Sequence, residues 1–347
     1  AHPALPSAAR DVHWIELDRL AAEIGGRAFA GERFFHAAKL GFDPQFLPDY
    51  LPFFRAAWRS AHGRVRKVLA VDLDNTLWGG VIGDDGIDGI RLGPGSAEGE
   101  AFAAWGAYLH GLRARGVILA ACSKNDPAIA AAAFAHPHSV LKREDFAAFE
   151  CSWEDKVRGL RRVARALNLG LDAIVFADDN PAEYAIVREH LPEVAVIELG
   201  DDPARFIALL EQGHWFDLPA YTAEDFARNA AYAARAAAAE AAADATDIGA
   251  YLAGLRMIGR LGPPTPADMA RLAQLEQKTN QFNLTTRRHP AAALAEFVGR
   301  PDAVLLALWL ADRFGDHGLV SSLIALAEDD ALRIESWLMS CRVFSRG

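Results

Sequence analysis

Short, continuous apolar runs recur along the middle of the chain and are separated by stretches that mix apolar and polar residues. Runs of this kind are typical of strands that are buried on both faces of a sheet. We predict four such strands, at residues 67–73 (KVLAVDL), 117–122 (VILAAC), 173–177 (AIVFA) and 194–199 (VAVIEL).

The stretches between these runs have the spacing of amphipathic helices. After Ser96, a suitable N-cap, apolar residues recur at helical intervals as far as Leu112, and Gly116 is placed to end the helix. Residues 154–170 and 181–190 predict two further helices. Strands that alternate with helices predict an α/β fold, with a mostly parallel sheet and helices on both of its faces.

The pattern changes on either side of this α/β region, which we assign to residues 63–218. Residues 1–62 contain short helical pieces rich in aromatic residues, and they predict a packed helical lead-in that we interpret as the tail of a preceding domain. The alanine-rich residues 219–246 predict a long helical linker. Residues 247–347 contain the strand-like runs AVLLALWLA, GLVSSLIALAE and ALRIESWLMSC, so they predict a smaller α+β domain.

Composition excludes several classes of protein. The 347 residues suffice for two domains, and the net charge of -10 without a basic stripe argues against nucleic acid as a partner. Three cysteines, at positions 122, 151 and 341, form no disulfide framework, so we expect a reducing compartment, the cytoplasm. The longest uninterrupted apolar run, residues 303–311, is too short to span a bilayer, so we expect no membrane partner.

Polar side chains follow the carboxyl ends of the predicted strands, where open α/β sheets place their functional sites. Residues i and i+2 of a strand point the same way, so Asp72 and Asp74 would repel each other unless a cation lay between them. Carboxylate oxygens suit Mg²⁺, which the sequence therefore predicts at this edge. The whole set comprises Asp72, Asp74, Ser123, Asn125, Asp178 and Asp179 near the strand ends and Lys156 at the start of a helix.

These residue types suit phosphoryl transfer. Asp72 can attack phosphorus as a nucleophile, and Asp74 can protonate the leaving oxygen and later deprotonate water. Ser123 and Lys156 can hold the non-bridging oxygens as charge builds. For the metal we predict the side chains of Asp72 and Asp178 as ligands, and Asp74 through its backbone carbonyl because its side chain is needed for proton transfer.

Two features of this region have alternative interpretations. Asp179 is either a second ligand, through water, or the cap of the helix that Pro181 begins. The loop from Trp78 to Gly86 is either functional or a β-hairpin flap without chemistry, and in both cases we expect it to cover the site.

The order of these motifs resembles the haloacid dehalogenase superfamily of phosphohydrolases. DLDNT stands for its first motif, SKN for the second, Lys156 for the third and DDNPAE for the fourth. The resemblance implies a Rossmann-like parallel sheet of the haloacid dehalogenase type. It also implies a Mg²⁺-dependent phosphatase site, with Asn125 among the residues that bind the substrate or its phosphate.

A narrower resemblance, over roughly residues 30–347, is to the FkbH-like subfamily. It rests on DLDNTLWGGVIGDDG, CSKND, WEDK, DDNPAE, QKTNQFNLTTRR and SCRVFSRG. It implies an acetyltransferase-like C-terminal domain and a glyceryl transferase/phosphatase of polyketide biosynthesis. Such enzymes load a glyceryl unit from 1,3-bisphosphoglycerate onto the phosphopantetheine thiol of an acyl carrier protein and remove phosphate. Because the sequence ends before the usual end of such proteins, we expect an excised module or a shortened variant.

Acyl transfer to a thiol carrier raises the question of an enzyme thiol. Cys341 lies beside Arg342 and Arg346, which can lower the pKa of a thiol, so we prefer it as the acyl-carrying residue. Cys122 is predicted to point away from the phosphate as a small core residue. Cys151 precedes Lys156 and lies near the site by proximity alone.

The segment TNQFNLTTRR carries more amides and hydroxyls than a core strand needs. We predict that Asn283 and Arg287 line a polar channel for substrate or pantetheine, together with Asn280, Gln281 and Thr285. The alternative is a capped turn between a helix and a strand.

The sequence therefore favours a Mg²⁺-dependent bifunctional glyceryl transferase/phosphatase. One alternative is a Mg²⁺-dependent phosphatase of a small phosphorylated metabolite, with the C-terminal domain as a lid. Another is a carrier-protein docking module with a vestigial phosphatase site, against which the intact set of aspartates, serine and lysine argues.

Overall fold

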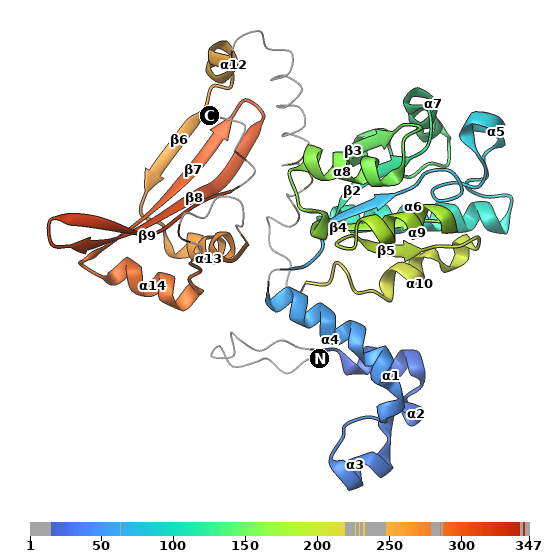
Figure 1. Cartoon of the computed structure of the whole chain (residues 1–347), viewed down its shortest axis with the longest axis horizontal. Coiled ribbons are helices and arrows are strands. Elements are labelled where there is room, and N and C mark those ends of the chain that lie inside the picture. The colour runs from blue at the N-terminus through green and yellow to red at the C-terminus, as the bar shows by residue number, and fades with distance from the viewer. Residues whose placement is uncertain are drawn as a thin grey trace. The chain divides into compact units, whose positions relative to one another are not determined.

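The computed structural model describes residues 15–62, 64–218, 248–278 and 287–340, together with Phe226, Asn229, Tyr232, Thr285 and Val343. The chain divides into two compact units, residues 1–226 and residues 227–347 (Figure 1). The first unit contains the helical lead-in and a parallel sheet, and the second contains an antiparallel sheet.

A five-stranded parallel sheet forms the centre of the first unit, with its strands in the order β3-β2-β1-β4-β5. Val68 at the start of β1 is in register with Ile118 of β2 and Ile174 of β4, so β1 lies in the middle of the sheet. The predicted α/β fold with a parallel sheet is confirmed. The strands are β1 (Val68–Val71), β2 (Ile118–Ser123), β3 (Phe146–Cys151), β4 (Ile174–Asp178) and β5 (Ala195–Glu198).

Helices connect these strands and cover both faces of the sheet (Figure 1). The predicted cap of α6 is confirmed, because Ser96 Oγ accepts a hydrogen bond from the Gly99 N–H at 3.0 Å. The helices are α5 (Ile82–Gly89), α6 (Ala97–Ala114), α7 (Pro127–Ala132), α8 (Lys156–Leu167), α9 (Pro181–His190) and α10 (Phe206–Glu211). Short 3₁₀ helices are η2 (Ala133–Ala135), η3 (Arg143–Asp145), η4 (Leu171–Ala173) and η5 (Pro203–Arg205).

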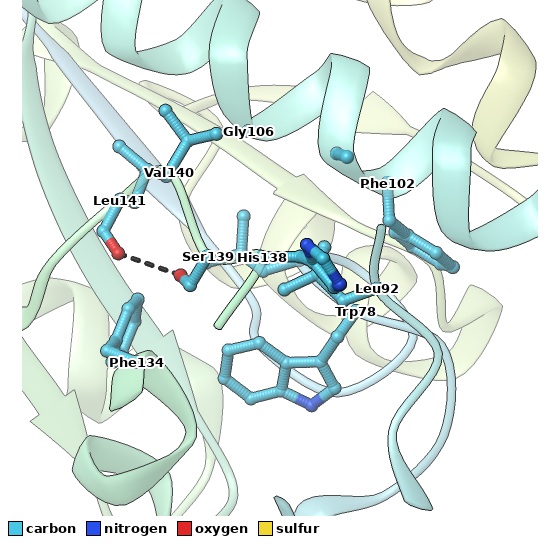
Figure 2. Close-up of a pocket in the computed structure, with 11 residues that line it drawn as sticks. Trp78, Leu92, Phe102, Gly106, Phe134, His138, Ser139, Val140 and Leu141 are labelled. Carbon is cyan, nitrogen blue, oxygen red and sulfur yellow. Dashed lines mark hydrogen bonds between the residues drawn. The ribbon is translucent and has the colours of Figure 1, made fainter. Parts of the chain in front are cut away.

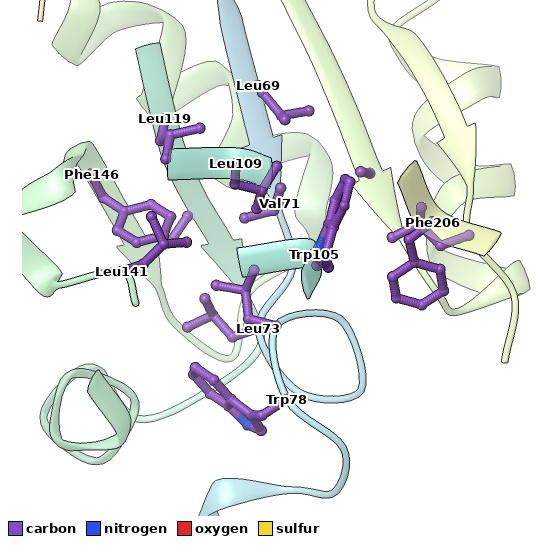
Figure 3. Packing of buried hydrophobic residues seen from close by; sticks show 14 of the residues in the cluster. Leu69, Val71, Leu73, Trp78, Trp105, Leu109, Leu119, Leu141, Phe146 and Phe206 are labelled. Atoms are coloured by element: carbon purple, nitrogen blue, oxygen red, sulfur yellow. The ribbon is translucent and has the colours of Figure 1, made fainter. Parts of the chain in front are cut away.

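The main core of the first unit lies between the sheet and α6 (Figure 3). Leu69 and Val71 point from β1 into this core, and Trp105 enters it from α6. The rings of Trp105 and Phe206 meet edge to face, with their centroids 5.9 Å apart. Truncating a fully buried aromatic side chain of this kind to Ala typically costs about 3 to 5 kcal/mol, so this packing fixes the sheet that positions the site.

The edge strand β3 is absent from the four strands predicted for this region. Three of its six residues are buried and three are partly exposed, and it contains Glu150. Because an edge strand has a neighbour on one side only, it needs no continuous apolar run. The central strands β1, β2 and β4 are buried at every position, and for this reason their sequences predicted them.

The lead-in consists of short helices around a small aromatic core. Leu20, Phe29 and Phe53 are its buried members. The guanidinium of Arg59 on α4 donates to the carbonyl oxygens of Gly213 and His214 at 2.9 and 3.2 Å, which ties the lead-in to the α/β part of the same unit. Its elements are α1 (Leu17–Ile24), α2 (Gly26–Ala30), α3 (Glu32–Ala38), η1 (Pro44–Phe46) and α4 (Leu47–Ala61).

The second unit contains an antiparallel four-stranded sheet in the order β6-β7-β8-β9. Helices α13 and α14 pack on it through a core that includes Leu272, Leu294 and Ile324. Its elements are α12 (Ile248–Gly254), β6 (Ile258–Gly262), η6 (Pro266–Asp268), α13 (Met269–Lys278), α14 (Ala291–Gly299), β7 (Ala303–Asp312), β8 (Gly315–Glu328) and β9 (Ala331–Met339).

The predicted α+β organisation of this unit is confirmed, with one strand added. β7, β8 and β9 match the three strand-like runs of the sequence, whereas β6 was not predicted because four of its five residues are exposed. The predicted helical linker at residues 219–246 lies outside the described residues, except for Phe226, Asn229 and Tyr232. Within the described part of the chain, no helix combines the length and the apolar character needed to cross a membrane.

Candidate active site

Asp72, Ser123 and Asp178 lie at the carboxyl ends of three neighbouring strands. β1 ends at Val71, and the N–H of Asp72 then donates to the Ala177 carbonyl of β4 at 3.0 Å. Ser123 and Asp178 are the last residues of β2 and β4, and both are buried. The parallel order β2-β1-β4 therefore brings these three side chains to one edge of the sheet.

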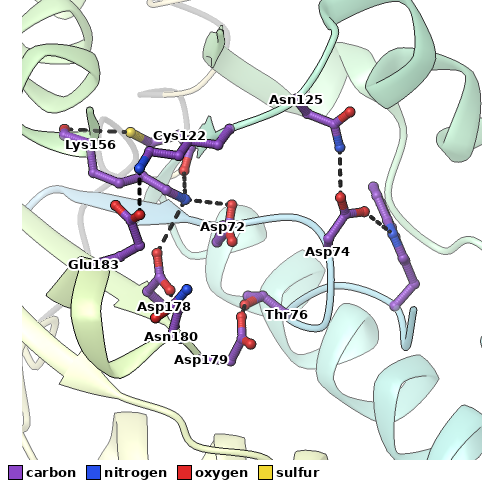
Figure 4. A network of polar contacts seen from close by, with 12 residues as sticks. Asp72, Asp74, Thr76, Cys122, Asn125, Lys156, Asp178, Asp179, Asn180 and Glu183 are labelled. Carbon is purple, nitrogen blue, oxygen red and sulfur yellow. Dashed lines mark hydrogen bonds and ion pairs between the residues drawn. The ribbon is translucent and has the colours of Figure 1, made fainter. Parts of the chain in front are cut away.

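Lys156 reaches this edge from the first position of α8. Its side chain is only 3% exposed, and its Nζ lies 2.6 Å from Asp72 Oδ1 and 3.2 Å from Asp178 Oδ2 (Figure 4). Nζ also donates to the carbonyl oxygen of Cys122 at 2.8 Å. Burial opposes the positive charge, but the carboxylates of Asp72 and Asp178 outweigh it and raise the pKa of Lys156. The lysine is therefore a fixed ammonium.

More carboxyl groups than ammonium groups lie at this edge of the sheet. Oxygens of Asp72, Asp178 and Asp179 all lie within 4.8 Å of one another, so three carboxyl groups share one ammonium. Apart from their ion pairs with Lys156, the buried oxygens Asp72 Oδ1 and Asp178 Oδ2 accept no hydrogen bond from the described residues. Burial, and then the charge of Asp72, raise the pKa of Asp178. One divalent cation would offset the excess of carboxyl groups, and an all-oxygen donor set fits Mg²⁺.

The carboxylate of Asp74 is held apart from this cluster by three donors (Figure 4). Its Oδ1 accepts from Trp78 Nε1 at 2.8 Å and from the Ile82 N–H at 3.0 Å. Its Oδ2 accepts from Asn125 Nδ2 at 2.8 Å. Burial outweighs these hydrogen bonds and raises the pKa of Asp74. A carboxyl group with a raised pKa and a fixed orientation suits proton transfer. The amide of Asn125, predicted to bind substrate or phosphate, here orients Asp74.

The structure ends the predicted strand before Asp72 and Asp74, which were expected on one of its faces. The strand ends at Val71, and Asn75 adopts a left-handed conformation with φ of 53°. Asn75 Oδ1 then accepts from the N–H of Gly80, whose φ is 99°. Asparagine and glycine tolerate positive φ better than other residues. This tight loop brings the Trp78 indole and the Ile82 N–H to the carboxylate of Asp74.

The alternative interpretation of Asp179 as a helix cap is wrong. Asn180 is the N-cap of α9, and its side chain accepts from the Ala182 N–H at 3.0 Å. Asp179 instead accepts from Thr76 Oγ1 at 2.9 Å and faces the other carboxylates. Its oxygens are therefore available to a bound metal, directly or through water.

The loop after Asp74 folds inward instead of forming the β-hairpin flap considered from the sequence. Trp78 is 2% exposed, and its ring lies against Phe134, with the centroids 5.7 Å apart. The indole also lines a small pocket with apolar walls that include Leu92, Phe102 and Leu141 (Figure 2). Sequence reasoning gave no role to Thr76 and no bond to Trp78, although both lie within four residues of Asp74.

A close approach between β2 and α8 allows Lys156 to reach the aspartates. Gly159 lies one turn after Lys156, and a Cβ at this position would be 2.7 Å from Cys122 Sγ. Cys122 is buried, as predicted for a core residue, and Cys151 is buried at the end of β3. Burial raises the pKa of each of these two thiols to about 12.

The candidates in the C-terminal unit are only partly described. The guanidinium of Arg287 pairs with Glu335, and Thr285 Oγ1 donates to the Glu335 carbonyl at 3.0 Å. Asn283 and Cys341 lie outside the described residues, so their predicted roles stay predictions.

Comparison with solved structures gives an informative match. No family model and no curated protein matches the sequence. A crystal structure of the N-terminal part of the protein BF1531 from Bacteroides fragilis, containing a phosphatase domain complexed with Mg, superimposes with a TM-score of 0.57 and 36% sequence identity. The match covers 60% of this chain and 55% of that chain, so it spans about half of the matched structure.

A second structure, of an uncharacterized protein from Corynebacterium glutamicum, is much less similar. It shares 15% identity at a TM-score of 0.30, over 43% of this chain and 96% of that chain. At this level of similarity, nothing about fold or function follows.

Proposed function

Because the α/β unit has a haloacid dehalogenase-like fold, we propose that it is a Mg²⁺-dependent phosphatase. The observation that carries the proposal is the separation of two carboxylate environments. Asp72 lies in the charged cluster with Lys156, whereas Asp74 is half-buried and bonded to neutral donors. Phosphoryl transfer through an aspartate needs these two roles, a nucleophile and a proton carrier. The similarity to a Mg-complexed phosphatase domain supports the same conclusion.

The chemistry proceeds in two displacements. A carboxylate oxygen of Asp72 attacks phosphorus, the bond from phosphorus to the ester oxygen breaks, and Asp74 gives its proton to the leaving alcohol. Asp74 then removes a proton from water, which attacks the same phosphorus and breaks its bond to Asp72, releasing phosphate. Ser123 and Lys156 hold the non-bridging oxygens during both displacements.

The cation would be held by the carboxylates of Asp72 and Asp178, with Asp179 within reach, and by the backbone carbonyl of Asp74. When bound, Mg²⁺ neutralises the charge that the carboxylates and the phosphate bring together. Lys156 cannot do this alone, because one ammonium already faces two carboxylates.

Metal removal and two substitutions test the proposal. EDTA should abolish phosphate release from phosphomonoesters, and added Mg²⁺ should restore it. Asp72→Asn should stop release from every ester, whereas Asp74→Asn should keep part of the activity toward aryl phosphates, whose leaving groups need no proton. Full activity in metal-free buffer, or identical behaviour of the two variants on aryl and alkyl phosphates, would contradict the mechanism.

The resemblance to FkbH-like proteins extends the proposal to the whole chain. The full chain would use 1,3-bisphosphoglycerate as substrate and load a glyceryl unit onto an acyl carrier protein in polyketide biosynthesis. A thiolate attacks the carbonyl carbon of the acyl phosphate, the bond from that carbon to the phosphate oxygen breaks, and phosphate leaves. The ester phosphate at the other end is then a substrate for Asp72. Because Cys122 and Cys151 are buried with raised pKa values, Cys341 is the preferred thiol.

Intact-mass spectrometry separates the transferase from a phosphatase of small metabolites. After incubation with 1,3-bisphosphoglycerate, the enzyme and the carrier protein should each gain a glyceryl adduct, and Cys341→Ala should lose both adducts while still hydrolysing simple phosphomonoesters. If Cys341→Ala loads the carrier normally, Cys341 is not the thiol. If the wild type loads no carrier, the transferase activity is refuted and only the phosphatase activity is kept.

A further inference from the structure

A histidine and an aspartate lie against each other in the second unit, at the hairpin that joins β7 to β8. Nε2 of His317 lies 3.0 Å from Oδ1 of Asp312. The side chain of His317 is 4% exposed, and that of Asp312 is fully buried. A buried carboxylate that faces an imidazole is the usual arrangement of a base and the group that orients it.

The turn of the hairpin holds the carboxylate of this pair. Oδ1 of Asp312 also accepts from the Phe314 N–H at 2.8 Å, within the turn that pairs Asp312 with Gly315. The Arg313 N–H in the same turn donates to the Leu255 carbonyl at 2.9 Å. Backbone groups therefore fix the position from which the carboxylate meets the imidazole.

The other nitrogen of the imidazole is left for another group. Nε2 faces Asp312, whereas Nδ1 forms no hydrogen bond with any residue in the described part of the chain. A carboxylate beside one nitrogen stabilises the imidazolium that forms when the other nitrogen accepts a proton. The geometry therefore suits proton uptake at Nδ1 of His317.

The end of β9 lies beside the part of β8 that follows His317. β9 runs antiparallel to β8, so its last residues meet the first residues of β8. The Ser340 N–H donates to the Val320 carbonyl at 2.7 Å. Val320 is three residues after His317, so their Cα atoms are at most about 11 Å apart. Cys341, the thiol preferred above, follows Ser340 directly in the sequence. The strand that leads to this thiol therefore ends where His317 lies.

We propose that His317 is the general base of glyceryl transfer and that Asp312 is its positioning residue. Nδ1 of His317 accepts the proton of the Cys341 thiol, and the thiolate attacks the carbonyl carbon of the acyl phosphate. The bond from that carbon to the phosphate oxygen breaks, phosphate leaves with the bonding electrons, and the imidazolium gives its proton to the departing phosphate. This inference rests on the transferase activity proposed above and on Cys341 as its thiol.

The rate at which iodoacetamide labels Cys341 in the full chain tests the base without relying on turnover. At pH 7, His317→Gln should slow this labelling about tenfold, because an adjacent imidazole raises the fraction of thiolate. Asp312→Asn should slow it as well, but less. At pH 10 the three proteins should label equally fast, because a thiol with the ordinary pKa of about 8.5 ionises there without a base. Peptide mass spectrometry measures each rate.

Loading of the carrier protein gives a second readout. With 1,3-bisphosphoglycerate, His317→Gln should form the glyceryl adducts on enzyme and carrier about a hundredfold more slowly than wild type, because a general base contributes at least about this factor. The variant should hydrolyse simple phosphomonoesters at the wild-type rate, because that reaction belongs to the first unit.

His289 provides a matched control in the same unit. Its Nε2 also lies near a carboxylate, 3.9 Å from Glu335 Oε1, so His289→Gln should label and load like wild type. Hydrogen exchange of the β8 amides should be the same in His317→Gln and wild type, which separates loss of the base from loss of the fold. If His317→Gln loses this protection, the labelling rate of Asp312→Asn, which keeps the imidazole, decides.

Three results would overturn the role of His317. They are equal labelling of Cys341 at pH 7 in the folded variants and wild type, no labelling of wild type, and a difference that persists at pH 10. If labelling behaves as expected but wild type loads no carrier, the transferase proposal fails, whereas the proton transfer from Cys341 to His317 stands.

Discussion

Replacing Lys156 with Met would remove the ammonium that separates Asp72 from Asp178. Methionine keeps much of the volume of the lysine stem but leaves the two carboxylates facing each other in a site where Asp178 is fully buried. Breaking a buried ion pair by removing one partner typically costs about 3 to 5 kcal/mol. We therefore expect the free energy of unfolding of the first unit to fall by this amount in EDTA at neutral pH.

Hydrogen exchange of the full-length chain measures the fall in the free energy of unfolding separately for each of the two units. In the regime where exchange reports the opening equilibrium, amides of β1 and β4 should exchange about one hundred- to several thousand-fold faster in Lys156→Met. Amides of β8, in the other unit, should be unchanged. Added Mg²⁺ should narrow the difference, because a cation bound by the carboxylates replaces part of the missing positive charge.

Lys124 provides the matched control. Its ammonium pairs with Glu183 at 2.5 Å at the same edge of the sheet, but its side chain is 40% exposed. Exposed ion pairs contribute about 0 to 1 kcal/mol, so Lys124→Met should barely change the exchange of β1. Equal effects of the two substitutions, or a Lys156→Met variant as stable as wild type in EDTA, would refute the charge balance described for this site.

Three further predictions follow from single contacts. Asn125→Ala removes one donor to Asp74, so hydrolysis of an alkyl phosphate should fall about tenfold more than that of an aryl phosphate, and an equal fall would argue against orientation of the acid. At pH 8, a thiol of pKa about 12 is ionised in about one molecule in ten thousand, so peptide mass spectrometry should find Cys122 and Cys151 unlabelled by iodoacetamide until urea unfolds the chain. Ser96→Ala should lower the free energy of unfolding, measured in urea, by about 1 kcal/mol, because α6 loses its cap.

Burial decided which strands the sequence could predict. β1, β2 and β4 have neighbours on both sides and helices on both faces, so all of their residues are buried and, apart from Ser123 and Asp178 at the strand ends, they form visible apolar runs. β3 and β6 are edge strands that backbone pairing defines, whereas the edge strands β5 and β9 also carry strand-like runs that the sequence showed. Such pairing depends on residues distant in sequence, and a single sequence carries little local sign of it.

The same distinction applies to the site. The residues at strand ends could be predicted to meet, because parallel strands deliver their carboxyl ends to one edge. The hydrogen bonds that hold Asp74 could not be predicted, because Trp78 and Ile82 reach its carboxylate only through the path of the loop from Asn75 to Gly80, two residues with positive φ. The bond from Trp78 to Asp74 and the bond from Thr76 to Asp179 are consequences of that path.

The contact between Gly159 and Cys122 implies a coupling between two positions that carry no chemistry of their own. A side chain at position 159 would push α8 away from β2 and withdraw the ammonium of Lys156 from Asp72, unless position 122 became smaller at the same time. Evolutionary drift at either position is therefore constrained by the other. In homologues that have diverged, a bulkier residue at 159 should accompany the loss of the sulfur at 122. The combined size of the two side chains would then stay within the distance between α8 and β2 that Lys156 requires.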